Sequence, residues 1–287
     1  MDKDIQEMYE KHDKLIRKLR RRRNITIILL SVLAFATVIA GFPIHIDTLD
    51  GTIIDYEGLP IAVTIILLIF IYLFVFILSV INQIPINAAL YNECDPKKHL
   101  ALNLAINFAS RLDHVKAMDY FYMGKFDASV KYADIMINSK NRNMVIAGYF
   151  NKARCEFFTE DFETLKETVK LYKNLVSTLK TKGKNRISAE KMLDSLDLMV
   201  AIADEDKEKL SGYRDVKPWT DSLINLGFVN YIKGRAAYIL DDKEDAAYRF
   251  NFVKENCAKT ILAEYSERYL SSQSIGTRTS LKGRRIL

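Results

Sequence analysis

Two long uncharged apolar runs stand out in the first third of the chain. The first, Ile25–Phe42, has 18 residues, the second, Ile61–Ile81, has 21, and neither contains Asp, Glu, Lys, Arg or His. A helix needs roughly 20 apolar residues to cross the ~30 Å hydrocarbon core of a bilayer. The pattern therefore predicts a transmembrane hairpin over residues 24–83, with spans at 25–42 and 61–81.

The charges that flank these runs indicate how the hairpin is oriented. Basic residues crowd before the first run, and Lys97 and Lys98 follow the second. The loop 43–60 has no Lys or Arg but four acidic residues. The positive-inside bias therefore predicts that both termini are cytoplasmic and that the acidic loop lies outside. The alternative interpretation is a signal peptide cleaved after Ala40, which the long charged segment before the run disfavours.

Residues 1–23 are predicted to form a cytoplasmic basic amphipathic helix. Acidic residues open this segment and basic residues close it, which matches the helix dipole. Each basic side chain near an anionic lipid surface contributes about 1 kcal/mol to membrane binding. The side chains expected at the lipid head groups are Arg17, Lys18, Arg20, Arg21, Arg22 and Arg23. A short coiled coil is an alternative, and homo-oligomerisation through this helix or through the spans stays open.

The rest of the chain is predicted to be all-α. Gly and Pro are scarce, at 11 and 5 residues, and no strand-like alternation of useful length follows Asp95. Asp95–Pro96 is predicted to start a helix, because Asp is a good N-cap and Pro suits the first helical position. Residues 84–112 are assigned to a connecting helix that restarts there after Pro85. The tail 271–287 is rich in Ser, Thr, Gly and Arg and is predicted to be disordered.

A spacing pattern recurs within the remaining segment, residues 113–270. A small residue in one helix is followed 12 residues later by a residue in the next helix, and then by others four and seven beyond it. The copies are Ala117, Ser129, Ala133 and Met136; Ala153, Leu165, Val169 and Tyr172; and Gly234, Ala246, Phe250 and Val253. Short polar turns separate the two helices of each copy, and a less regular hairpin fits Ile187–Arg214.

This pattern resembles the tetratricopeptide repeat family, with its best match at Tyr122–Ser129. The resemblance covers roughly residues 110–258 and implies a TPR-like α-solenoid of about four helical hairpins with a concave binding surface. The sequence departs from the family pattern, because Met136, Tyr172 and Val253 are larger than the usual small residue and no proline closes the repeats. An ordinary helical bundle whose hairpins share a length is the alternative.

The resemblance also implies which side chains face the concave surface. Two copies place an arginine one turn before an aromatic residue, and both residue types are enriched in binding hot spots. The predicted partner-binding residues are Arg154, Phe157, Phe158, Arg235, Tyr238, Phe121 and Tyr122. The alternative is that the aromatic side chains pack between helices and the arginines are solvated. The family's carboxylate clamp is not supported, because His114 and Met118 stand where its first pair would be.

No motif for catalysis or cofactor binding is present. The sequence lacks the phosphate loop, the dinucleotide fingerprint, the nucleophile elbow and the zinc-protease motif. The nearest approach to a metal set is Cys94, Asp95, His99 and His114, but Cys94 and His99 do not share a helix face. No enzyme activity, cofactor or metal is therefore predicted, and the three cysteines are predicted to be free, mostly buried thiols. The mixed charge of the helical segment argues against nucleic-acid binding.

These observations predict a multi-pass protein of a plasma membrane, and the richness in Lys, Ile and Asn suits a bacterium. Its predicted function is a scaffold or adaptor that binds a protein or peptide at the inner membrane face. The alternative is an accessory or immunity-type membrane subunit that acts through its transmembrane hairpin, with the helical domain as regulator. A third hypothesis is an enzyme with an unrecognised site.

Overall fold

The computed structural model describes residues 3–42, 44–47, 53–56, 61–106, 112–179 and 184–275. The chain divides into two compact units. The membrane unit comprises Tyr9–Ile86, and the helical domain comprises Asn87–Leu287 together with Met1–Met8. Both units are built from helices, apart from one short pair of strands.

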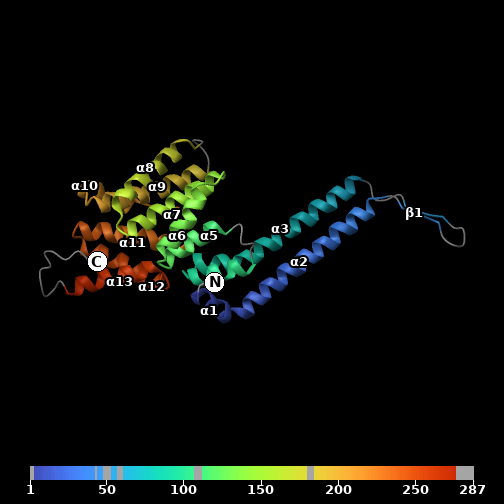
Figure 1. Cartoon of the computed structure of the whole chain (residues 1–287), viewed down its shortest axis with the longest axis horizontal. Helices are drawn as coiled ribbons and strands as arrows, with labels where there is room; N and C mark the ends of the chain where they lie inside the picture. The colour runs from blue at the N-terminus through green and yellow to red at the C-terminus, as the bar shows by residue number, and fades with distance from the viewer. Residues whose placement is uncertain are drawn as a thin grey trace. The chain divides into compact units, whose positions relative to one another are not determined.

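Two long helices form the membrane unit: α2 (Asp13–Ala40) and α3 (Ile61–Tyr91) (Figure 1). Their most apolar windows have mean hydropathies of 2.0 and 3.1, and no part of these windows is buried. Side chains such as Phe35 and Phe70 are 68% and 65% exposed. Two helices are therefore long and apolar enough to cross a membrane, as the sequence predicts.

The sequence misplaces two boundaries in this region. The predicted N-terminal helix breaks at His12 between α1 (Lys3–Lys11) and α2, so the basic cluster belongs to the same helix as the first span. Helix α3 continues through Pro85, because Ile86, Ala89 and Leu90 in the following turns are fully buried and their packing offsets the lost backbone bond.

The predicted acidic loop carries two antiparallel strands, β1 (Ile44–Asp47) and β2 (Ile53–Tyr56). Ile44 pairs with Tyr56 and Asp47 pairs with Ile53. Residues 48–52 between the strands lie outside the described part of the chain. The sequence analysis predicted only a loop for this segment.

In the helical domain, Asp95 precedes the first helix after α3. Its side chain accepts a hydrogen bond from the Lys98 backbone N–H at 3.0 Å and caps that helix, as predicted. The elements of this domain are α4 (Pro96–Ile106), α5 (Asp113–Tyr122), α6 (Phe126–Ile137), α7 (Arg142–Phe158), α8 (Phe162–Ser177), α9 (Lys184–Ala203), α10 (Lys207–Leu210), the 3₁₀ turn η2 (Tyr213–Asp215), α11 (Leu223–Ile239), α12 (Lys243–Asn256) and α13 (Ile261–Ile275). Helix α13 extends into the predicted disordered tail, so that prediction is wrong for residues 271–275. Residues 276–287 lie outside the described part.

Four hairpins share one turn geometry: α5–α6, α7–α8, α9–α10 and α11–α12. The second residue after each first helix has a positive φ: 73° at Gly124, 59° at Glu160, 51° at Glu205 and 62° at Asp241. The next N–H in each case donates to the carbonyl five residues earlier, at 2.8–3.0 Å. This double signature is a Schellman motif. The third hairpin, which fits the sequence pattern poorly, therefore ends its first helix as the others do.

The spacing of 12 residues corresponds to close contacts between the paired helices. The Ser129 hydroxyl donates to the Ala117 carbonyl at 2.6 Å, so the small residue lies directly against its partner helix. At Gly234, an added Cβ would lie 2.8 Å from the Phe250 ring. The small residues are thus required because the second helix approaches closely.

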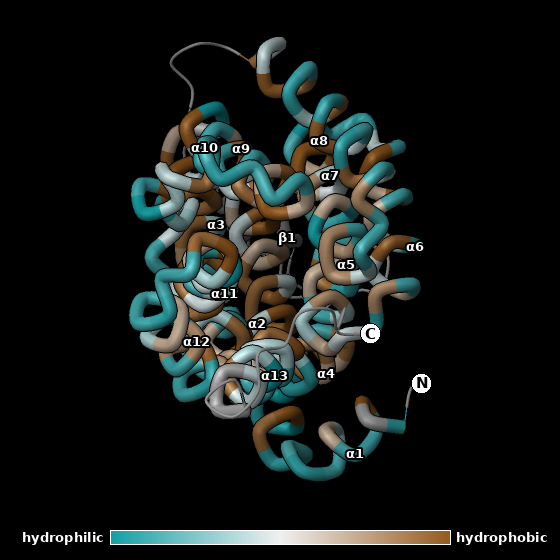
Figure 2. Tube along the Cα trace, turned by 90° about the vertical axis from the view of Figure 1, so that its left-hand side faces the viewer, coloured by the Kyte–Doolittle hydropathy of each residue, from teal (hydrophilic) through white to brown (hydrophobic). Residues whose placement is uncertain are grey.

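The hairpins do not form an open array. The inner helices α5, α7, α9, α11 and α13 each pack against the next, and α13 packs against α5, which closes a ring (Figure 2). Contacts at the closure include the Lys259 ammonium with the Asp95 carboxylate at 2.9 Å and the Cys94 and Cys257 thiols, whose Sγ atoms are 3.4 Å apart. The predicted TPR-like solenoid is not confirmed, because the face that would be concave is the interior of this ring.

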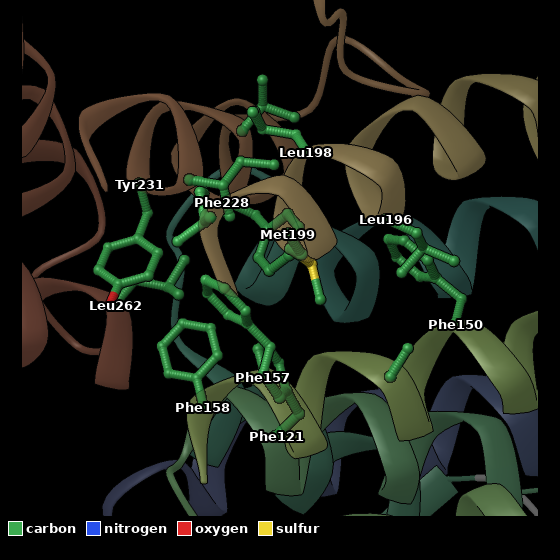
Figure 3. Packing of buried hydrophobic residues seen from close by; sticks show 14 of the residues in the cluster. Phe121, Phe150, Phe157, Phe158, Leu196, Leu198, Met199, Phe228, Tyr231 and Leu262 are labelled. Atoms are coloured by element: carbon green, nitrogen blue, oxygen red, sulfur yellow. The ribbon is translucent and has the colours of Figure 1, made fainter. Parts of the chain in front are cut away.

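Aromatic side chains fill the ring (Figure 3). The Phe121 ring is fully buried and has its centroid 5.3 Å from that of Phe158 and 6.1 Å from that of Phe228. Phe158 in turn stacks on Tyr231 at 5.0 Å. These contacts join α5, α7 and α11 in one core.

We expect a mild oxidant such as copper–phenanthroline to link Cys94 to Cys257 within one chain. Their Sγ atoms need to approach by little more than 1 Å to reach the bond length of a disulfide, about 2.05 Å. Each thiol loses a proton and the oxidant accepts two electrons. Peptide mapping by mass spectrometry checks the linkage. Cys155, which has no second thiol beside it in the described part of the chain, is the internal control that stays reduced. Absence of the Cys94–Cys257 peptide would contradict the ring closure.

Candidate functional site

The predicted partner-binding residues are mostly inside the ring. Phe121, Tyr122 and Phe157 are fully buried, and Phe158 and Arg154 are 5% and 2% exposed. The aromatic side chains thus pack between helices, as the alternative interpretation expected, but Arg154 is buried with them and not solvated as that interpretation expected. Of the seven residues, only two reach the surface: Tyr238, which is 39% exposed, and Arg235, which is half-buried.

The two arginines that the repeat pattern singles out line different pockets. Arg235, with Phe157 and Phe158, lines a pocket of about 230 Å³ at the end of the ring where α7 and α11 end. Arg154, with Tyr122, lines a pocket of about 430 Å³ at the end where α7 and α11 begin. We call these the Arg235 pocket and the Arg154 pocket.

Aromatic rings hold the guanidinium in the Arg235 pocket. Its Cζ atom lies 5.2 Å from the ring centroids of both Phe157 and Tyr269, within the range of cation–π attraction. Among the described residues, no carboxylate forms an ion pair with Arg235. Aromatic rings therefore compensate part of its positive charge, which can also pair with an acidic group.

Tyrosine side chains from α11 and α13 surround this arginine. The exposed Tyr238 ring meets Tyr269 edge to face at 5.3 Å, and the Arg268 guanidinium lies 4.7 Å from the ring centroid of Tyr265. The Tyr231 hydroxyl is buried and has no hydrogen-bond partner within the described part of the chain. Burial raises the pKa of Tyr231, so this hydroxyl is a neutral donor at physiological pH. The site thus presents only donors and cations beside rings, except for the exposed Glu160 at its edge.

The Arg154 guanidinium is buried without a carboxylate partner among the described residues. It donates to the Tyr122 hydroxyl at 3.0 Å and to the Asn151 side-chain oxygen, and its Nε atom has no hydrogen-bond partner there. Burial raises the pKa of Tyr122 to about 12, although the arginine opposes this change. Aromatic rings compensate part of this charge, because the Arg154 Cζ atom lies 4.2 Å from the ring centroid of Phe121 and 4.8 Å from that of Phe150. A buried charge without a counter-ion still costs free energy, and a bound anion would supply that counter-ion.

One buried polar pair escaped the sequence analysis. The His99 Nδ1 atom lies 2.7 Å from the Asp119 carboxylate, and these side chains are 3% and 0% exposed. Burial raises the pKa of Asp119 to about 6, against the effect of His99. The two residues are 20 positions apart, so no local sequence motif predicts that they pair. Neither lines either arginine pocket, and the pair joins α4 to α5.

The residues considered as a metal set have other partners. Cys94 contacts Cys257, Asp95 caps α4, His99 pairs with Asp119, and His114 lines the Arg154 pocket. The part of the chain that the structure describes holds no cluster of three or more potential metal ligands. Burial raises the pKa of the Cys155 thiol to about 11, which makes it a poor nucleophile.

Comparison with known proteins adds no assignment. No protein-family model, no curated protein and no solved structure matches this chain. The geometry described above is therefore the basis for the function.

Proposed function

We propose that this protein is a membrane-anchored adaptor that binds a protein partner at the cytoplasmic face of a membrane. The two exposed apolar helices α2 and α3 supply the anchor. The lack of Lys and Arg in the loop 43–60, against the basic clusters on the other side of each span, supports cytoplasmic termini. The helical domain then lies on the side where the partner is recruited.

The Arg235 pocket carries this proposal. It places an arginine without a carboxylate partner beside tyrosines, and Arg, Tyr and Trp are the residue types that dominate binding hot spots. Tyr238 and Arg268, which are 39% and 47% exposed, extend the pocket onto the surface of α11 and α13. An acidic side chain of a partner would pair with Arg235 and exclude water from it, which strengthens the charge-assisted bond.

Crosslinking in cells, followed by affinity purification in detergent, tests this contact. We expect a partner to be recovered with wild type in stoichiometric amount. The amount recovered with Arg235→Glu should be at least tenfold lower, because the substituted side chain repels an acidic group. Tyr238→Ala should reduce the recovery while leaving the core intact. Arg142→Glu, on an exposed arginine at the start of α7, is the matched control and should recover the partner fully.

Two outcomes would overturn the proposal. If Arg235→Glu and Tyr238→Ala both keep the partner, the contact lies elsewhere, in the spans or the basic segment. If no variant and no wild-type sample yields a partner, the adaptor function itself fails.

A groove in the membrane unit favours the second candidate, an accessory membrane subunit that acts through its hairpin. Apolar side chains of α2 and α3, including Ile25, Leu29, Phe74 and Leu78, line a groove of about 400 Å³ that could receive a partner's transmembrane helix. Replacing both spans with unrelated apolar helices separates the two candidates. The adaptor keeps its partner after the exchange, whereas the accessory subunit loses it.

A further inference from the structure

The end of the Arg154 pocket that holds Arg154, Tyr122 and Asn151 presents hydrogen-bond donors. The Arg154 Nε–H is buried and unpaired, and no described residue accepts the proton of the Tyr122 hydroxyl. The Asn151 amide offers its NH₂ group, since its oxygen already accepts from Arg154. None of the described lining residues is acidic. This end of the pocket is therefore complementary to a group that accepts hydrogen bonds.

The charge of the pocket matches a monoanion. Arg154 is the only Lys or Arg among the described lining residues. Helix α11 adds a partial positive charge, because its N-cap Ser222 and first-turn Asn225 line the pocket and the Ser222 side chain does not cap the helix. One guanidinium and one helix terminus balance a single negative charge, as on a carboxylate, better than the double charge of a phosphate monoester.

The walls of the pocket are apolar and aromatic. Phe150 and Trp219 meet edge to face at 4.7 Å, and Tyr91 and Met118 complete the lining. The volume of about 430 Å³ falls within the range of small-molecule sites, roughly 300–1,000 Å³. An extended peptide has no groove here, because aromatic rings fill the inner face of the helices.

We infer that the Arg154 pocket binds a small aromatic carboxylate, with the carboxylate on Arg154 and Tyr122 and the ring against Phe150 and Trp219. This site is separate from the Arg235 pocket and goes beyond the proposed adaptor function. A bound carboxylate supplies the counter-ion that the buried guanidinium lacks.

Trp219 is the only tryptophan of the chain and lines the pocket, so its fluorescence reports binding directly. With the full-length protein in detergent, we expect phenylacetate to change Trp219 emission saturably at millimolar concentration. Phenylacetamide, which has the same ring but no charge, should bind at least tenfold more weakly. Arg154→Met should abolish the response, and Arg235→Met should leave it unchanged.

Asn151→Asp provides a second variant that does not remove the arginine. The new carboxylate would stand beside the Arg154 guanidinium and supply the missing counter-ion internally. We expect this variant to melt at a higher temperature than wild type and to lose at least tenfold in affinity for phenylacetate. A merely structural Arg154 would not give both results together.

Four results would overturn the inference. They are equal responses to phenylacetate and phenylacetamide, an unchanged response in Arg154→Met or Asn151→Asp, no saturable response in wild type, and tenfold tighter binding of an octapeptide that ends in phenylalanine. Tighter binding of the octapeptide would instead mean that the pocket binds the C-terminus of a partner protein. None of these results depends on the Arg235 pocket, so the adaptor proposal is tested separately.

Discussion

Replacing Phe121 with Ala is expected to lower the free energy of unfolding of the helical domain by about 3–5 kcal/mol, the range for deleting a buried aromatic side chain. Phe121 is fully buried and contacts rings from α5, α6, α7 and α11. The Arg154 guanidinium also lies 4.2 Å from its ring centroid. The substitution leaves a cavity where these helices meet. The free energy of unfolding therefore falls by more than the transfer free energy of the deleted apolar surface.

Urea unfolding of the full-length protein in mild detergent, followed by far-ultraviolet circular dichroism, measures this change. Tyr248→Ala is the matched control, because Tyr248 is 68% exposed on α12, and we expect its effect to stay within about 0.5 kcal/mol. In an open solenoid, Phe121 would lie on a solvated concave face. A cost below about 1 kcal/mol for Phe121→Ala would therefore contradict the closed ring.

Replacing Glu156 with Gln is expected to stabilise the protein by about 2 kcal/mol at pH 7. Glu156 is 5% exposed on α7, and burial raises its pKa to about 6 although Thr168 and Lys152 oppose the change. Its Oε1 atom accepts from the Thr168 hydroxyl at 3.0 Å, and its Oε2 atom has no partner among the described residues. Glutamine keeps the first bond and removes the buried charge.

The pH dependence follows from the direction of this change. The folded protein holds the Glu156 proton more tightly than the unfolded chain, whose carboxyl has an ordinary pKa of 4.5. The stability that Glu156 contributes is therefore complete below pH 4.5 and is lost as the pH rises through about 6. At about 1.4 kcal/mol for each pH unit between these values, the loss is about 2 kcal/mol.

Unfolding free energies of wild type and Glu156→Gln between pH 4 and 8 test this prediction. The two proteins should be equally stable near pH 4 and diverge up to pH 7. Asp119, whose pKa is also raised to about 6, titrates in both proteins and cancels in the difference. The control Glu167→Gln, on the exposed side of α8, should show no such divergence. A constant difference across the range would assign the effect to packing instead of charge.

The sequence predicted both arginines of the candidate sites but not their different environments. The repeat pattern identified Arg154 and Arg235 as equivalent positions beside aromatic residues, and both line pockets. It could not separate them, because rings of α5 and α11, such as Phe121 and Phe228, bury Arg154, whereas Arg235 stays half-buried. Trp219 lies outside the repeats, in the segment before α11, and no local signal placed it beside Phe150.

The sequence by itself determined the features that depend on neighbouring residues. The absence of charge over residues 25–42 and 61–81 marks the two helices that can span a membrane, because burying a charge in hydrocarbon is costly. Helix starts at Pro96, Phe162 and Lys243 follow from N-cap aspartates that bond to nearby backbone N–H groups. The spacing of 12 residues follows from the length of one hairpin.

Only the tertiary structure decided the features that depend on distant residues. Whether the hairpins stay open or close depends on contacts such as those of Cys94 with Cys257 and Asp95 with Lys259, which are more than 160 positions apart. Closure turns the expected concave surface into the interior of the ring, and contacts between α5, α7 and α11 bury Arg154. The pairing of His99 with Asp119 and the passage of α3 through Pro85 were decided in the same way, because packing outweighs local preference where the side chains are buried.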